Sequence, residues 1–123
     1  MNKFAVWFGR LVWVGIVANF AMALPGLFLP QQLLSFFSFP PASPPLWPSF
    51  ASLLLILLSL FYMPGAIYPF HYRANAYLAV ISRLAGVLFF FSAPSPYFLF
   101  GLYDLTFAIP QAILLILALK TGN

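Results

Sequence analysis

Four long apolar runs, separated by clusters of proline, glycine and polar residues, dominate the amino-acid sequence. They cover about residues 4–24, 47–64, 74–92 and 97–119. A helix needs about 20 apolar residues to cross the hydrocarbon core of a bilayer, and each run is close to that length. The pattern predicts an all-α fold, an integral membrane four-helix bundle that forms a single transmembrane domain over residues 1–123.

Proline is expected to mark the helix ends, because it lacks a backbone donor and clashes with the preceding turn. Residues 25–26 (Pro-Gly) are predicted to end the first span, and residues 64–65 (Pro-Gly) the second. Residues 94–96 (Pro-Ser-Pro) separate the third span from the fourth, which makes those two helices antiparallel neighbours. Pro110 lies inside the fourth span, where it predicts a kink.

The connection between the first two spans is itself divided into two parts. Residues 31–39 are too few to cross a bilayer, and Pro30 suits the first position of a helix. We therefore expect a short amphipathic helix that lies in the membrane interface. Residues 40–48 contain five prolines and predict an extended loop.

The first apolar run also has the features of a signal peptide. It carries Lys3 and Arg10 at its start and the small-x-small triplet Ala-Met-Ala at residues 21–23. We expect the run to be retained as the first transmembrane helix.

Composition and charge support a membrane protein and predict its orientation. The chain of 123 residues is 64% hydrophobic and 5% charged, whereas a soluble domain has about 25% charged residues. With four spans, Lys3, Arg10, Arg73 and Lys120 all lie on one side, so both termini are expected in the cytoplasm. The predicted location is the bacterial inner (cytoplasmic) membrane. The basic residues are dispersed along the chain, so we expect no nucleic-acid partner.

A polar stripe follows one face of the third span. Asn75, Ala79, Ser82, Arg83 and Gly86 recur at helical spacing. Lipid offers such groups no hydrogen bonds, so the stripe is expected to face other helices.

The fourth span carries a matching stripe that includes Asp104 and Gln111. At 1.5 Å per residue, Arg83 and Asp104 lie at heights that differ by only ~5 Å, which predicts a salt bridge between these spans. The pair is interpreted as a structural lock, or as a contact with a ligand, a proton path or a partner subunit. Asn19 on the first span is expected to hydrogen-bond another helix, with a ligand contact as the alternative.

Few side chains are available for catalysis. The sequence has one acidic residue, one histidine and no cysteine. Acid/base hydrolysis of a glycoside needs two carboxylates, and a zinc site needs three or four ligands. We therefore predict no enzyme activity and no metal site, and the residues identify no cofactor. His71 is expected at the membrane interface, with a haem ligand or proton relay as alternatives.

Aromatic residues are abundant, with 16 Phe, 6 Tyr and 3 Trp. The phenylalanines of the third and fourth spans gather toward the outer half of the membrane, where most are expected to face lipid or to pack between helices. The alternative is a site for a quinone, a carotenoid or a hydrocarbon chain.

The layout resembles that of small four-helix membrane proteins of the DoxX-like group. The similar features are four spans in about 120 residues, a proline-bounded first span followed by a Leu/Phe-rich turn (residues 24–39), and Arg83 followed by Gly86. The resemblance implies an accessory subunit beside a quinone-linked or redox partner. It assigns no catalytic residue.

The expected function is a non-catalytic accessory or stabilising subunit of a larger membrane complex, in respiratory or photosynthetic electron transfer. The expected partners are membrane lipid and other membrane protein subunits. One alternative is a stand-alone binder or carrier of a lipophilic molecule such as a quinone or lipid. A small-solute transporter is a weaker alternative.

Overall fold

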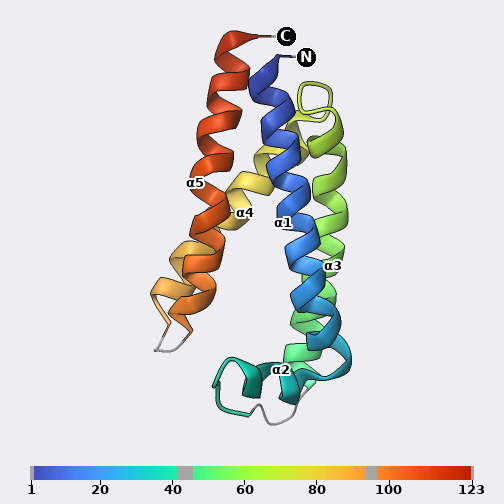
Figure 1. Ribbon diagram of the computed structural model, residues 1–123, viewed down its shortest axis with the longest axis vertical. Coiled ribbons are helices and arrows are strands. Elements are labelled where there is room, and N and C mark those ends of the chain that lie inside the picture. Colours follow the sequence, from blue (N-terminus) through green and yellow to red (C-terminus); the bar gives the residue numbers. More distant parts are fainter. Residues whose placement is uncertain (1, 42–45, 94–96, 123) are drawn as a thin grey trace. The chain divides into compact units, whose positions relative to one another are not determined.

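The computed structural model describes residues 2–41, 46–93 and 97–122, and this part of the chain is helical with no strand (Figure 1). Its helices are α1 (Lys3–Phe28), α2 (Pro30–Phe36), α3 (Leu46–Ile67), α4 (Arg73–Phe91) and α5 (Phe98–Thr121). The helices α1, α3, α4 and α5 are long and apolar enough to cross a membrane. The predicted all-α membrane fold is confirmed at this level.

Two prolines lie inside helices that they were predicted to end. Pro25 is within α1 and Pro64 is within α3, so both helices extend beyond the predicted boundaries at residues 24 and 64. The backbone continues past Pro25, whose carbonyl accepts a hydrogen bond from the Leu29 amide at 2.7 Å. Transmembrane helices tolerate proline when packing and local adjustments compensate for the missing donor. Pro110 lies inside α5, as the sequence predicted.

The short helix after the first span is present. Pro30 is at the start of α2, which has 7 residues, and the predicted boundary at Phe39 is too late. Ser38 has a φ of 60°, a left-handed conformation that ends the helical path. The last part of the predicted proline-rich loop, residues 46–48, belongs to α3. Residues 42–45 of that loop and the predicted break at residues 94–96 lie outside the described residues.

The chain divides into two compact units, and each is described by itself. The first unit (Met1–Gly15 and Phe61–Asn123) contains the start of α1, the end of α3, and all of α4 and α5. Small side chains dominate its core, which lets the helices approach closely. The buried alanines of this unit are Ala5, Ala66, Ala76, Ala79, Ala108 and Ala118.

Within the first unit, α4 and α5 are neighbours. Gly65 in α3 lies against α4, because a Cβ atom at Gly65 would be 2.5 Å from the Ala76 nitrogen. Gly9 in α1 lies against the backbone of Ala66 in the same way. Close backbone contacts therefore connect the parts of α1, α3 and α4 in this unit.

The second unit (Ile16–Leu60) contains the rest of α1, the helix α2 and most of α3. Ser49 at the start of α3 donates a hydrogen bond of 3.0 Å to the carbonyl of Leu27 near the end of α1. Gly26 in α1 lies directly against the Ser52 hydroxyl, where a larger residue would collide. Gly26 thus serves helix packing, and the Pro-Gly pair at residues 25–26 does not end the helix.

Candidate functional site

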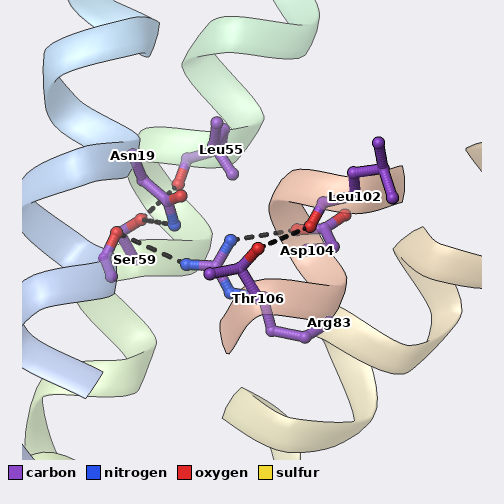
Figure 2. Close-up of polar contacts among 8 residues, drawn as sticks. Asn19, Leu55, Ser59, Arg83, Leu102, Asp104 and Thr106 are labelled. Carbon is purple, nitrogen blue, oxygen red and sulfur yellow. Dashed lines mark hydrogen bonds and ion pairs between the residues drawn. The ribbon is translucent and has the colours of Figure 1, made fainter. Parts of the chain in front are cut away.

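The candidate site of the first unit centres on Arg83, which α4 places among apolar helices. Only 4% of the Arg83 side chain is exposed. Its Nη1 atom lies 3.0 Å from the Oδ1 atom of Asp104 on α5, which is 15% exposed (Figure 2). The two residues predicted to share one membrane layer therefore meet directly. A charge in this setting is costly when alone, and the pairing offsets much of that cost.

A third helix contributes to the site through its backbone. The Nη2 atom of Arg83 donates a hydrogen bond of 3.3 Å to the carbonyl of Gly15 in α1. A helical carbonyl has a second lone pair beyond the one used by its own helix. Glycine makes this approach feasible, since a Cβ atom at position 15 would lie 2.8 Å from Nη2. The guanidinium therefore connects α1, α4 and α5.

Two aromatic rings of α5 lie near the guanidinium. The Cζ atom of Arg83 is 4.8 Å from the ring centroid of Phe107 and 5.3 Å from that of Tyr103. Both distances are within the range of cation–π attraction, which is strongest where water is excluded. One helical turn separates these residues, so both rings project beside Asp104 on the same helix. The rings and the carboxylate together form a cage for the positive charge.

Gly86 provides space for the other half of the pair. A Cβ atom at this position would collide with the Oδ2 atom of Asp104, so the carboxylate lies against the α4 backbone. Ser82 is one turn away and half-buried. The small residues of α4 thus bring α5 close enough for Asp104 to reach Arg83.

Two buried atoms in the described part of the first unit have no hydrogen-bond partner. They are the Nε atom of Arg83, a donor, and the Oε1 atom of Gln111, an acceptor. Gln111 is 1% exposed. A Cβ atom at Gly15 would lie 3.6 Å from the side-chain amide nitrogen of Gln111 and 2.8 Å from Nη2 of Arg83, so both side chains approach the same position on α1. The structure thus brings Gln111 next to the ion pair.

A separate polar contact lies in the second unit. The side-chain amide of Asn19 on α1 donates a hydrogen bond of 3.0 Å to the hydroxyl of Ser59 on α3 (Figure 2). Ser59 donates in turn to the Leu55 carbonyl of its own helix at 2.9 Å. Asn19 and Ser59 are both buried. Asn19 therefore makes an inter-helix hydrogen bond, and both groups are neutral.

Asn75 and His71 lie away from the ion pair. The side-chain amide of Asn75 donates to the carbonyl of Phe61 at 2.6 Å, which links α4 to α3. His71 is exposed, and its ring contacts Tyr72 edge-on at 4.5 Å. The described residues contain no group of three side chains able to hold a metal ion.

Several residues of the site were not predicted from the sequence. Tyr103 and Phe107 could have been found from their helical spacing around the single acidic residue. The carbonyl of Gly15 gives no sequence signal, because every residue has one. Ser59 is one of three serines in α3, and nothing in the sequence distinguishes it from Ser49 and Ser52 as the partner of Asn19.

Comparisons of the chain with protein-family models, curated proteins and solved structures give no match. The resemblance to the DoxX-like group stays an expectation.

Proposed function

We propose that this protein is a non-catalytic accessory or stabilising subunit of a larger membrane complex. The observation that supports this proposal best is the inward direction of its central charges. Arg83 bonds Asp104 and Gly15 and lies beside two aromatic rings of the same chain. An arginine held in this way acts as a lock between helices, and such a lock suits a rigid structural role.

The outward faces of the helices support the same role. Buried residues make up 33%, 28%, 28% and 22% of the most apolar stretches of α1, α3, α4 and α5. Most residues of these stretches are therefore at least partly exposed to lipid or to the helices of other subunits. Helix association in membranes depends on packing and hydrogen bonding, because lipid is already as apolar as the helices. A rigid chain with broad apolar flanks fits such packing.

The proposed partner is a quinone-linked or other redox complex of respiratory or photosynthetic electron transfer. This part of the proposal rests on the resemblance to the DoxX-like group. The bacterial cytoplasmic membrane is the proposed location, since the one-sided cations suit a membrane that obeys the positive-inside rule.

Native mass spectrometry after purification from the native membrane in mild detergent tests the subunit proposal. We expect the chain to co-purify with larger membrane proteins in a fixed ratio. Asp104→Asn should weaken this association, because it disrupts the helix packing around Arg83. A stable monomer that carries a bound lipid or quinone would contradict the proposal.

A second candidate function is the binding of a lipophilic molecule, and one group of aromatic residues favours it. Phe90 contacts Phe89 on α4 at 5.1 Å and Phe100 on α5 at 5.2 Å between ring centroids. Phe89 is 68% exposed, so this cluster presents a ring at the surface. A planar quinone could stack there. This function would be supported over the first if the purified protein retained a quinone and Phe89→Ala released it. Phe98→Ala, at another exposed ring, is the control and should leave the quinone bound.

The proposed topology has both termini in the cytoplasm. It rests on Lys3, Arg10, Arg73 and Lys120, which lie on one side when four helices span. A reporter fused after Asn123 should be cytoplasmic, and one inserted after Pro41 should lie outside. Reporters on the same side would contradict the topology.

A further inference from the structure

Four cations of the first unit have no carboxylate side chain to pair with. The sequence contains one acidic side chain, Asp104, and Arg83 already occupies it. The other basic residues are Lys3, Arg10, Arg73 and Lys120, and all four are exposed. They account for the formal net charge of +4.

These cations converge on one end of the first unit. The side chain of Asn2 hydrogen-bonds the carbonyls of Ala118, at 3.0 Å, and Gly122, which brings the start of α1 beside the end of α5 (Figure 1). Lys3 and Lys120 each lie within two residues of this contact. The backbone contact of Gly9 with α3, described above, places Arg10 beside the last turn of that helix. Arg73 begins α4 immediately after the connection from α3.

Three of the four cations lie over aromatic rings. The distance from the cationic centre to the ring centroid is 5.3 Å for Lys3 and Phe4, 4.9 Å for Arg10 and Trp7, and 5.9 Å for Arg73 and Phe70. Tryptophan and other aromatic residues favour the interface of a bilayer, where an apolar ring meets lipid and a polar group meets water. Basic side chains behave similarly, with their stems in lipid and their charges among the headgroups.

We propose that this end of the first unit binds the headgroups of anionic phospholipids. We name it the basic–aromatic end, and define it by Lys3, Arg10, Arg73 and Lys120 with the rings of Phe4, Trp7 and Phe70. Unpaired cations next to membrane-spanning helices attract anionic headgroups, while the rings contact the acyl chains of the same lipids. The charges sit on three helices around this end, an arrangement that suits several lipid headgroups better than a single free phosphate. The inference does not depend on which side of the membrane this end faces.

Lipid titration of the purified full chain tests the proposal. Native mass spectrometry would count the molecules of phosphatidylglycerol and of phosphatidylcholine retained in detergent. We expect a preference for phosphatidylglycerol, which carries a net negative charge. Phosphatidylcholine is zwitterionic and serves as the reference. Equal retention of the two lipids would overturn the proposal.

Charge variants connect the preference to the basic–aromatic end. The quadruple variant Lys3→Gln, Arg10→Gln, Arg73→Gln and Lys120→Gln should lower the preference by about 600-fold, since each basic residue near a membrane surface contributes about fivefold. The double variant Lys3→Arg and Lys120→Arg keeps the charge and should keep the preference. Gln32→Ala changes an exposed neutral residue and should have no effect. An unchanged preference in the quadruple variant would contradict the proposal.

Two further arms make the result decisive. If the quadruple variant does not fold, the double variant Lys3→Gln and Lys120→Gln takes its place, with an expected loss of about 25-fold by the same rule. Inorganic phosphate at the concentration of the lipid should leave phosphatidylglycerol bound. Displacement of the lipid by phosphate would show a free-phosphate site and overturn the assignment to lipid.

Discussion

In the first unit a pair of opposite charges joins two helices, whereas in the second unit a neutral amide and a hydroxyl do so. Arg83 and Asp104 connect α4 to α5, and Asn19 and Ser59 connect α1 to α3. The surroundings also differ. Arg83 has a carboxylate, a backbone carbonyl and two rings around it, whereas Ser59 directs its proton to a carbonyl of its own helix.

The difference shows how strongly each contact depends on its partner. A single charge among apolar helices costs several kcal/mol, so Arg83 requires a counter-charge. A neutral side chain in a transmembrane helix loses less, because hydroxyl groups can bond the backbone of their own helix. We therefore expect substitutions at the ion pair to be far more damaging than substitutions at Asn19 and Ser59.

The largest expected effect is that of Asp104→Asn. The substitution keeps the shape of the side chain and removes the charge that compensates Arg83. The free energy of unfolding should fall by about 3–5 kcal/mol, the usual range for breaking a buried ion pair. Unfolding by titration with a denaturing detergent, followed by circular dichroism, measures the change.

Thr106→Val is the matched control for Asp104→Asn on the same helix. Thr106 is exposed, and its hydroxyl donates a hydrogen bond to the Leu102 carbonyl of the same helix. Loss of this hydroxyl should therefore change stability little. Equal effects of the two substitutions would remove the distinction between charged and neutral groups.

Gly86→Ala should have the next largest effect. The new methyl group would occupy the position of the Asp104 carboxylate and push it away from Arg83. Overpacking of this kind destabilises by about 1–3 kcal/mol. Gly101→Ala is the control, because its Cβ atom would meet the Phe91 ring at 2.7 Å, and a ring at the end of a flexible side chain can move. Gly101→Ala should therefore be the milder change in the same unfolding assay.

Phe107→Leu tests the aromatic part of the cage. Leucine keeps much of the apolar volume and removes the ring face that attracts Arg83, so the loss should be about 1–2 kcal/mol. In the Asp104→Asn background the remaining rings become the main stabilisers of the guanidinium, and the same substitution should cost more. Equal losses in the two backgrounds would show that the ring acts by packing alone.

The smallest effect is expected in the second unit. Asn19→Leu removes the hydrogen bond to Ser59 and leaves no charge unpaired, so the loss should be about 0.6 kcal/mol, the average for such bonds in membrane proteins. Ser59→Ala should have a similar or smaller effect. A loss from Asn19→Leu as large as that from Asp104→Asn would contradict the comparison between the two units.

The sequence predicted the four long apolar helices of the described part of the chain, because a run of about 20 apolar residues is the length that a helix needs to cross a bilayer. The sequence also predicted that Arg83 and Asp104 meet. That prediction used the number of residues between each of them and the end of its helix, which gives the two residues similar heights. Helix ends at Pro25 and Pro64 were predicted wrongly. Gly26 and Gly65, which follow these prolines, pack directly against neighbouring helices, and such contacts are not visible in the local sequence.

Two features of the site could not be predicted for a different reason. The carbonyl of Gly15 became a partner of Arg83 through the register between α1 and α4. Likewise, the register between α1 and α3 decides that Asn19 hydrogen-bonds Ser59 and not another serine of α3. Register follows from side-chain packing along whole helices, and a pattern of polar positions leaves several registers open.

A double-mutant cycle on the ion pair tests the central claim, that Arg83 and Asp104 stabilise the protein as a unit. The free energy of unfolding would be measured for Arg83→Gln, Asp104→Asn and the double variant. We predict that the double variant is less damaged than the sum of the single variants by about 1–3 kcal/mol, because neither remaining residue requires a counter-charge. A double variant whose loss equals that sum within about 0.5 kcal/mol would show that the two residues act independently, and would contradict the claim.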